Sequence, residues 1–502
     1  MVKIEGVLSV DLGTQSIRAA LYNLKGQLLS LATEGYKTYY PAPGLAEQNP
    51  EDWWEALKLA VQKLTRECPM VSVVAIAASA TSSTVLPVDC EGNPLTKAIL
   101  WMDTRASKQA RRISETLHPL LEWCGGTVSP EWFWPKLLWI KEERPEVYSE
   151  AYHIVEALDW LNYKLTGRWV SSQCNASCKW NYLSDKGWSN DFFEEIGVPE
   201  FMVKIPSEVL PMGTVIGKLQ KETALDLKCK DGIPVVQGGI DAHASVVGLG
   251  NFEEGETSLV LGSSSVILIN TSFCSPISGF WGPYKEPLWK GFNLLEAGQT
   301  SSGSIMNWFI ERIAKHYISE ADKRNLSPFD LLDAEAFKVP PGSQGVVVLD
   351  HWQGNRTPYK DPDSRGVVYG LTLSHEASHV GRAIYEGISF GIRLLLDYLK
   401  EEGIYTTCIK ACGGGTKSGL WMQILADVCE QPLDVTVENM TLLGNAIVGA
   451  TGVGIFSSFA EGFEIMQPNF TRVNSKTSFS VYQENYERYC RLYPLAKGLR
   501  EI

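Results

Sequence analysis

One short turn pattern occurs twice in this chain, about half a chain length apart. The first copy reads LGTQSI at residues 12–17, and the second reads LGSSSV at residues 261–266. Each copy follows a short apolar run and leads into another, which predicts a strand, a tight glycine turn and a second strand. The repeat therefore predicts two related halves, each presenting backbone N–H groups and hydroxyls to a ligand that lies between them.

The two copies differ just before the turn, where Asp11 in the first copy corresponds to Val260 in the second. A carboxylate is thus present on one side only. Turns rich in free N–H groups bind phosphate oxygens, and a nearby acid holds a divalent cation. We expect the hairpins to hold phosphate and Asp11 to hold the metal. The alternative is that both turns are ordinary hairpins and that Asp11 is a solvated turn residue.

The length of 502 residues favours more than one domain, because single hydrophobic cores rarely grow beyond about 250–300 residues. Together with the repeat, this predicts an N-terminal domain over residues 1–248 and a C-terminal domain over residues 249–502. The formal net charge of −13 argues against nucleic acid or an anionic membrane surface as a partner. No apolar stretch of the sequence approaches the roughly 18 residues that a membrane span requires.

The hydrophobic pattern predicts mixed α/β structure in both halves, the second repeating the plan of the first. We expect strands over residues 4–22, 73–77, 85–88, 234–236, 258–269 and 406–411. The segment 85–88 is expected to continue the first sheet. Helices are expected to begin at Pro50 and to cover residues 108–117, 303–318 and 375–402.

The eleven cysteines are scattered along the chain. Cys174/Cys178 and Cys408/Cys412 have helix-like spacing, but no nearby histidine completes a zinc-binding pattern for either pair. The odd count and the lack of a secretory signal favour reduced thiols in a cytoplasm over a disulfide framework or a structural zinc site.

A second glycine-marked segment, GGIDAHA at residues 238–244, follows a predicted buried strand. Its Asp241 would open a helix of small residues and place a carboxylate at the helix N-terminus, facing a cleft. Such a carboxylate can take the proton from an alcohol that attacks phosphorus. The alternative is a simple helix cap, since aspartate is favoured there, and His243 is expected to pack or to orient a neighbour rather than to bind metal.

A third glycine segment, ACGGGTKS at residues 411–418, lies between a predicted strand and a predicted helix. Glycines let a flat or anionic ligand approach the backbone closely. The spacing is neither that of a Walker loop nor the G-x-G-x-x-G of a dinucleotide fold. The base or ribose of a nucleotide could rest on this loop, although a tight strand-to-helix turn would also account for its glycines.

Taken together and in this order, the motifs resemble the FGGY family of carbohydrate kinases, within the actin/Hsp70/sugar-kinase superfamily, over nearly the whole chain. Residues 11–18 look like the family's first phosphate motif, and residues 261–265 look like its second, with Ser263 in place of a commoner threonine. Residues 239–244 look like the segment that carries the catalytic aspartate, and residues 413–418 look like the nucleotide-binding loop.

This resemblance implies two ribonuclease-H-like domains that flank a catalytic cleft and close on a sugar and MgATP. It implies that Asp241 is the general base for a primary alcohol that attacks the γ-phosphoryl group, and that Asp11 lies near Mg²⁺. The residues implied in binding ATP are Gly13, Thr14, Gln15, Ser16, Arg18, Gly262, Ser263, Ser264, Gly413, Gly414, Gly415, Thr416 and Lys417.

Finer features resemble the ribulokinase-like branch of the family, whose substrates are keto-pentoses or their polyols. Among them are WMDTRA at residues 101–106, CKWNY at 178–182, EAGQ at 296–299 and GNRTP at 354–358. A sugar site needs groups that pair with hydroxyls and an aromatic wall. The candidates for sugar contact are Thr81, Ser82, Asp103, Arg105, Trp132, Lys179, Asp241, Glu296 and Gln299. Several have plainer alternatives, such as a surface ion pair between Asp103 and Arg105.

The leading hypothesis is an ATP-dependent kinase that phosphorylates the terminal hydroxyl of a pentulose, ribulose first. Xylulose, ribitol, erythritol or another polyol is an alternative substrate within the same fold, and pocket details decide between them. A non-catalytic switch that responds to sugar or nucleotide is the alternative from a different class, and the presence of both Asp11 and Asp241 argues against it. The resemblance also allows a homodimer, because such kinases commonly form one.

Overall fold

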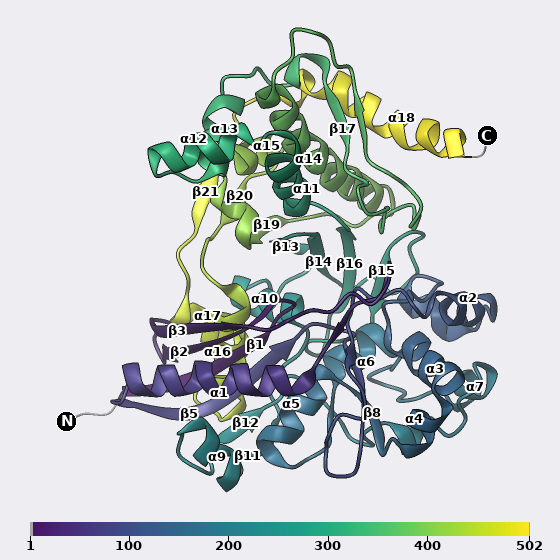
Figure 1. The fold of residues 1–502 in the computed structure, drawn as a ribbon, viewed down its shortest axis with the longest axis vertical. Coiled ribbons are helices and arrows are strands. Elements are labelled where there is room, and N and C mark those ends of the chain that lie inside the picture. Colours follow the sequence, from purple (N-terminus) through teal and green to yellow (C-terminus); the bar gives the residue numbers. More distant parts are fainter. Residues whose placement is uncertain (1–3, 501–502) are drawn as a thin grey trace.

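A computed structural model describes residues 4–500 of the chain. It consists of two lobes, each built around a mixed β-sheet with helices on its faces (Figure 1). The predicted α/β class is confirmed. None of the helices between residues 4 and 500 combines the length and the apolar character that a membrane crossing demands.

The first lobe contains a six-stranded sheet in the order β11-β12-β5-β1-β2-β3. Its strands are β1 (Ile4–Leu12), β2 (Ser16–Asn23), β3 (Leu28–Gly35), β5 (Val71–Ala80), β11 (Val215–Lys218) and β12 (Pro234–Val236). Helix α1 (Pro50–Glu67) packs against β2 and β3. It begins with a proline and two acidic residues, which suit a helix N-terminus, and it buries an apolar stripe from Trp53 to Leu64.

The second lobe contains a seven-stranded sheet in the order β15-β16-β14-β13-β19-β20-β21. Its strands are β13 (Glu256–Leu261), β14 (Ser265–Thr271), β15 (Trp281–Tyr284), β16 (Asn293–Gln299), β19 (Cys408–Cys412), β20 (Leu433–Val435) and β21 (Thr471–Val473). The helices of this lobe are α11 (Gly303–Trp308), α12 (His316–Arg324), α13 (Pro328–Ala336), α14 (Ala377–Glu401), α15 (Gly419–Cys429) and α18 (Gln483–Arg500). A small hairpin of β17 (Val347–Leu349) and β18 (Val367–Tyr369) packs beside them.

The two sheets share one connectivity. In the first lobe, β1 forms a hairpin with β2 and runs parallel to β5, which in turn runs parallel to β12. In the second lobe, β13 forms a hairpin with β14 and runs parallel to β19, which runs parallel to β20. The turn repeat in the sequence therefore marks equivalent hairpins in two copies of the same sheet.

The two lobes do not coincide with the two halves of the sequence. Helices α16 (Met440–Gly452) and α17 (Phe459–Met466) come from the second half, yet they lie beside β1–β3 in the first lobe (Figure 1). Ser9 Oγ donates to the Leu442 carbonyl at 2.6 Å, and Asn445 Nδ2 donates to the Val10 carbonyl at 2.8 Å. Helix α16 also packs closely on α10 (Asp241–Leu249), which joins the lobes at the centre of the molecule.

The rest of the first lobe is a helical subregion around a separate four-stranded sheet. That sheet has the order β4-β7-β6-β8 and comprises β4 (Glu47–Gln48), β6 (Val85–Val88), β7 (Ala98–Ile99) and β8 (His153–Glu156). The expectation that residues 85–88 continue the main sheet is wrong, because β6 pairs with β7 and β8 instead. The surrounding helices are α2 (Ser107–Glu115), α3 (Phe133–Glu143), α4 (Pro145–Glu150), α6 (Gln173–Lys179), α7 (Asn190–Glu195) and α8 (Phe201–Lys204), with the short strands β9 (Ser171–Ser172) and β10 (Val209–Leu210). Helix α5 (Ala157–Thr166) packs on β5 and β11 of the main sheet, and α9 (Lys221–Leu227) packs on α1.

Two other expectations also need correction. The helix expected over residues 303–318 is broken, since α11 passes into a π-helical turn, Phe309–Ile313, before α12 begins. Cys408 and Cys412 lie at the two ends of strand β19 and not on a helix. The four-residue spacing of Cys174 and Cys178 does lie on a helix, α6.

Candidate active site

A cavity of about 520 Å³ lies between the two lobes and is lined from both. The first hairpin turn contributes Gly13 and Thr14, and the second contributes residues 262–264. Asp241 and the glycine loop at residues 413–414 line the same space. The fold therefore brings the three glycine-marked segments, which are far apart in the sequence, to one cavity.

The glycine N–H closes each hairpin turn, although the second turn is one residue shorter. The N–H of Gly13 donates to the Ser16 carbonyl at 3.1 Å, and the N–H of Gly262 donates to the Ser264 carbonyl at 2.9 Å. Trp101 also fixes the first turn, since its indole N–H donates to Thr14 Oγ1 at 3.1 Å. Two equivalent turns facing one cavity are a geometry that can hold an anion from both sides.

Asp11 is completely buried at the end of β1 and does not itself line the cavity. Its carboxylate forms an ion pair with Arg18, which lies opposite it across the hairpin, and accepts a hydrogen bond from Ser79 Oγ at 3.3 Å. Burial raises the pKa of Asp11 above its ordinary value, although Arg18 and Ser79 pull it down. The second hairpin has Val260 opposite Val266, so this charge pair belongs to the first hairpin alone.

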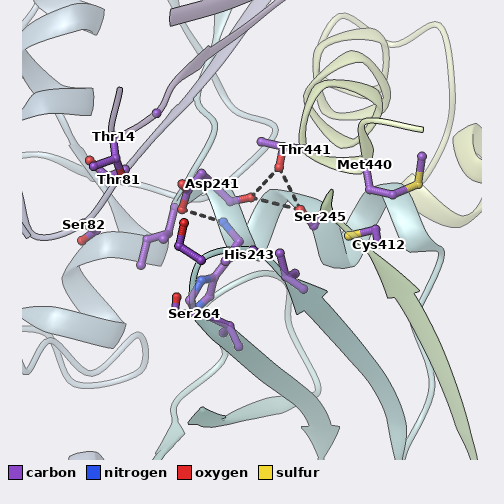
Figure 2. Close-up of a pocket in the computed structure, with 18 of the residues that line it drawn as sticks. Thr14, Thr81, Ser82, Asp241, His243, Ser245, Ser264, Cys412, Met440 and Thr441 are labelled. Atoms are coloured by element: carbon purple, nitrogen blue, oxygen red, sulfur yellow. Dashed lines mark hydrogen bonds between the residues drawn. The ribbon is translucent and has the colours of Figure 1, made fainter. Parts of the chain in front are cut away.

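Asp241 is the first residue of α10 and lies near the centre of the cavity (Figure 2). Its Oδ1 accepts a hydrogen bond from the backbone N–H of Ala242 at 2.7 Å. Burial, with a further contribution from the Asp11 carboxylate, raises the pKa of Asp241 to about 7 despite the opposing effect of Arg18. A carboxylate with this pKa is about half ionised at neutral pH, which suits a residue that accepts and returns a proton.

The position of Asp241 is held by the helix pair behind it. Its carbonyl accepts hydrogen bonds from Ser245 Oγ at 3.3 Å and from Thr441 Oγ1 at 3.2 Å. The two hydroxyls also bond each other at 2.9 Å, as the dashed lines in Figure 2 show. The N-termini of α10 and α16 are thereby tied together, and this fixes the backbone of Asp241 relative to α16.

A buried ion pair lies in the part of the cavity formed by α6 and β16. Lys179 Nζ is 2.7 Å from Glu296 Oε2, and both side chains are less than a tenth exposed. Burial favours the neutral form of Glu296, but the charge and hydrogen bond of Lys179 oppose that effect, and the pKa lies below the ordinary value. Because Lys179 comes from the first lobe and Glu296 from the second, the pair joins the two walls of the cavity.

Aromatic rings form the wall beside this ion pair. Lys179 Nζ lies 4.6 Å from the ring centroid of Trp281 and 5.5 Å from that of Trp132. The two indoles pack edge to face at 5.5 Å. An aromatic wall next to charged hydrogen-bonding groups is a typical environment for a polyhydroxylated ligand.

A second ion pair between the lobes closes the rim of the cavity. Arg356 Nη2 is 3.3 Å from Glu131 Oε2, and the guanidinium lies 4.9 Å from the ring centroid of Trp281. Both charged side chains line the cavity and are mostly buried. The sequence pattern included Arg356 but did not indicate a contact with Glu131.

The loop that carries Thr81 and Ser82 is supported by a buried lysine. Lys136 Nζ donates to the carbonyls of Ser83 and Leu100, both at 2.7 Å. Its side chain is fully buried, and burial lowers the pKa of Lys136 to about 7, against the nearby carboxylates that raise it. The hydroxyl-bearing loop is thus held from behind, while Thr81 and Ser82 face the cavity.

Asp103 and Arg105, expected to contact the sugar, do not line this cavity. Asp103 is buried and accepts a hydrogen bond from the backbone N–H of Ala46 at 2.7 Å, and Arg105 pairs with both Asp103 and Glu47. The segment after residue 100 packs on the strand that contains Glu47. The side chains of Asp103 and Arg105 hold this packing through their bonds to Ala46 and Glu47. The two residues therefore form the ion pair that the sequence analysis gave as an alternative, but the pair is buried and not on the surface.

Four more predicted residues lie outside the cavity lining. Gln299 is buried, and its amide donates to Asp350 Oδ2 at 2.8 Å and to the Ile388 carbonyl at 2.9 Å. The Thr416 hydroxyl bonds the carbonyls of Gly413 and Thr436 and so supports the glycine loop from below. Gln15 is exposed at the tip of the first hairpin, with Ser16 beside it.

A second cavity, of about 610 Å³, extends into the second lobe. Its far end is lined by the apolar and aromatic side chains of Met306, Phe329, Tyr385 and Trp421. The two cavities share the lining residues Gly262, Ser263, Gly414 and Lys417. They meet where the second hairpin turn and the glycine loop approach each other, with Gly415 on the side of the second cavity.

Most of the predicted site residues therefore gather around the two joined cavities. These are Gly13, Thr14, Arg18, Thr81, Ser82, Trp132, Lys179, Asp241, Gly262, Ser263, Ser264, Glu296, Gly413, Gly414, Gly415 and Lys417. Lining residues that sequence reasoning missed include Glu131, Trp281, Asn439 and Thr441. They lie in a loop or at the ends of elements without a local motif, so only the tertiary fold reveals them.

Comparison with known proteins places this geometry in a family. The model of the FGGY family of carbohydrate kinases, N-terminal domain, matches residues 6–248, and that of the C-terminal domain matches residues 257–453. A human FGGY carbohydrate kinase domain-containing protein is 32% identical, covering 97% of this chain and 95% of that protein. A ribulokinase from Geobacillus thermodenitrificans is 29% identical, covering 97% and 94%.

Solved structures show the same fold. The xylulose kinase from Rhodospirillum rubrum superposes with a TM-score of 0.86 at 24% identity, covering 99% of this chain and all of that one. The glycerol kinase from Plasmodium falciparum, solved with ADP, gives a TM-score of 0.83 at 22% identity. The family matches extend over most of both lobes and include all three glycine-marked segments. The chain therefore belongs to the FGGY family of carbohydrate kinases.

Proposed function

We propose that this sugar kinase transfers the γ-phosphoryl group of ATP to the terminal hydroxyl of a pentulose, ribulose first, with Asp241 as the general base. The observation that carries the proposal is the position of Asp241. It lies in the cavity shared by the two phosphate-type turns, with a pKa raised to about 7. The 29% identity to proteins named ribulokinase over nearly the whole chain supports ribulose as the first substrate to test.

The two joined cavities suggest how ATP would lie. The apolar end of the second cavity, with Phe329 and Trp421, suits the adenine ring. The residues shared by both cavities, Gly262, Ser263, Gly414 and Lys417, would then hold the phosphates. The γ-phosphoryl group would reach the first cavity beside Gly13 and Thr14, opposite Asp241. Backbone N–H groups and one lysine would offset its negative charge.

Mg²⁺ is proposed to bind near Asp11. A carboxylate is the oxygen ligand that Mg²⁺ prefers, but Asp11 is buried, paired with Arg18 and outside the cavity lining. A cation beside the first hairpin turn would therefore have Asp11 as a nearby negative charge and not as a group that lines the cavity. When bound, the cation supplies neutralisation of the phosphate charge.

The chemical step requires one proton acceptor and an in-line arrangement. Ionised Asp241 accepts the proton of the sugar hydroxyl, the hydroxyl oxygen forms a bond to Pγ, and the bond from Pγ to the β-phosphate oxygen breaks. The proton then returns to solvent with product release. Closing the lobes keeps water from replacing the sugar as acceptor, and the Lys179–Glu296 and Glu131–Arg356 pairs already join the walls that would close.

The proposed sugar contacts are Thr81, Ser82, Trp132, Lys179 and Glu296, which line the cavity around Asp241. We assign Asp103, Arg105 and Gln299 to supporting roles, because their polar groups bond other parts of the protein. In each of the pairs Lys179–Glu296 and Arg356–Glu131, the positive charge balances the negative charge. Hydroxyl groups, which can bond either member of a pair, therefore suit the site.

Three further proposals accompany the function. The sequence divides into an N-terminal kinase domain over residues 1–248 and a C-terminal one over residues 249–502, with α16 reaching back to the first lobe. The protein acts in the cytoplasm. It forms a homodimer, as kinases of this kind commonly do.

The experiment is a coupled assay of ADP formation with D- and L-ribulose, D- and L-xylulose, ribitol and erythritol. The proposal expects turnover that depends on sugar and is fastest with one ribulose isomer. Faster turnover with xylulose or a polyol would replace the substrate and keep the mechanism. ATP consumption that ignores every sugar would contradict a sugar kinase, and binding of sugar or nucleotide without turnover would favour the non-catalytic switch.

A further inference from the structure

Three groups that bind soft metals gather directly behind Asp241. Cys174 and Cys178 lie on α6, and His243 lies on α10, two residues after Asp241. One ligand atom from each of the three lies within 4.8 Å of the other two. All three side chains are at most 1% exposed. The proposed kinase mechanism uses neither thiol.

The spacing of these atoms matches that of a zinc site. Zn–S bonds of about 2.3 Å and Zn–N bonds of about 2.0–2.1 Å at the tetrahedral angle separate sulfur from nitrogen by about 3.6 Å. Cys178 Sγ lies 3.5 Å from His243 Nε2. We propose that Cys174, Cys178 and His243 form a binding site for Zn²⁺ or a similar thiophilic divalent cation.

The local fold accounts for this convergence. Residues four apart on a helix share one face, so α6 directs both thiols to the same side. The glycine pair before Asp241 brings the second element close, since a Cβ at Gly239 would lie only 2.9 Å from Cys174 Sγ. The sequence spacing gave no zinc pattern because His243 joins the cysteines only through the packing of α10 on α6.

The hydrogen bonding of His243 is incomplete for a fully buried ring. Its Nε2 has a thiol as the near partner, and its Nδ1 has no hydrogen-bond partner among the described residues. Burial lowers the pKa of His243 to about 4, so the ring is neutral, which is the form that binds metal. A cation between the thiols and Nε2 would replace the weak thiol contact at that nitrogen, with Nδ1 then carrying the ring proton.

The charges around the site are compatible with a divalent cation. When the metal binds, each cysteine loses its thiol proton to solvent, and the two thiolates balance the charge of the cation. The neighbouring Lys179–Glu296 pair is already neutral as a unit. Glu296 Oε2 lies 4.0 Å from His243 Nε2, so a carboxylate is also close to the ligand atoms.

The test uses the full-length protein, freed of metal with a chelator and kept reduced. Co²⁺ serves as the probe, because thiolate ligation gives an intense thiolate-to-cobalt charge-transfer band. We expect one equivalent to produce the band and Zn²⁺ to remove it. The double variant C174S/C178S should lose it, the variant H243Q should weaken or shift it, and Cys429→Ser, a buried cysteine of α15, should keep it. No band in the unmodified protein, or an unchanged band in the double variant, would overturn the proposal.

A second measurement covers variants that fail to fold. In the unmodified protein, alkylation of each cysteine is followed by peptide mass spectrometry with and without Zn²⁺. Zn²⁺ should slow the alkylation of Cys174 and Cys178 by about tenfold or more and leave Cys90, which is exposed, unaffected. Equal rates at Cys174 and Cys178 with and without Zn²⁺ would overturn the site. Neither readout involves ATP or sugar, so the proposed kinase function stands or fails separately.

Discussion

Replacing Asp241 by asparagine removes the proposed base and keeps the size of the side chain. The amide oxygen can still accept the hydrogen bond from the backbone N–H of Ala242. We expect kcat to fall about 10²–10⁴-fold, because general-base help contributes that much to such reactions. ATP should still bind, since Asp241 does not line the apolar second cavity.

The pH profile adds a second signature. With the pKa of Asp241 raised to about 7, the ionised fraction rises about tenfold between roughly pH 6 and pH 8. The base acts in its ionised form, so kcat/KM of the unmodified enzyme should rise by a similar factor over this interval. The asparagine variant should lack this rise, since its amide does not titrate.

The same carboxylate should make the fold less stable at neutral pH. A pKa raised from 3.8 to about 7 corresponds to at most about 4 kcal/mol, since each unit is worth about 1.4 kcal/mol. The folded state holds this proton more tightly, so the favourable contribution is complete below about pH 4 and is lost as the pH rises through 7. The amide introduced by Asp241→Asn cannot ionise, so the variant should be the more stable protein near pH 8 and about equal near pH 4.

Steady-state kinetics from pH 6 to 9 check the rate predictions. Urea unfolding at pH 4 and at pH 8 checks the stability prediction. Glu438→Gln, a cavity residue in front of α16, serves as a control for removing one negative charge. The reasoning is refuted if D241N keeps turnover within a few-fold of the unmodified enzyme. It is also refuted if the pH rise persists without the carboxylate.

Three other substitutions test the supporting geometry. Asp11→Ala should raise the Mg²⁺ concentration needed for half-maximal rate, and an unchanged Mg²⁺ titration would exclude the metal role. Lys136→Met should lower the free energy of unfolding by about 2–5 kcal/mol, because two buried carbonyls lose their donor, and unchanged urea unfolding would contradict this. Glu131→Gln and Arg356→Ala should each raise the sugar KM, and a double-mutant cycle should give a coupling of about 0.5–3 kcal/mol. Strictly additive effects would show that this ion pair does not act across the lobes.

Much of the architecture could be predicted because local patterns recur. The turn at Gly13 and the turn at Gly262 each close a hairpin, and the two hairpins occupy equivalent places in sheets of the same connectivity. The return of α16 to the first lobe could not be predicted in this way. Its contacts, such as Asn445 with the Val10 carbonyl, join residues more than four hundred positions apart and leave no periodic signal.

In the candidate site, too, local motifs predicted some residues, and only the tertiary fold brings in the others. Residues within glycine-marked motifs, such as Asp241 and Gly413, were found because the backbone geometry depends on the residue type at those positions. For Asp103 and Arg105 the sequence left sugar contact and an ion pair open, because a charged pair looks the same in sequence whether it binds a ligand or another part of the chain. Glu131 was missed because its partner, Arg356, lies in the other half of the sequence.

The proposed phosphoryl transfer requires the triphosphate to pass between the two hairpin turns. Its γ-phosphoryl group must then meet a sugar hydroxyl that Asp241 binds. A crystal structure with a non-hydrolysable ATP analogue and ribulose would test this most directly. The account predicts the terminal sugar oxygen about 3–3.5 Å from Pγ and about 2.6–3.2 Å from the Asp241 carboxylate, with Gly13 and Gly262 on opposite sides of the phosphates. A γ-phosphate remote from Asp241, or a sugar bound with another oxygen toward it, would contradict the account.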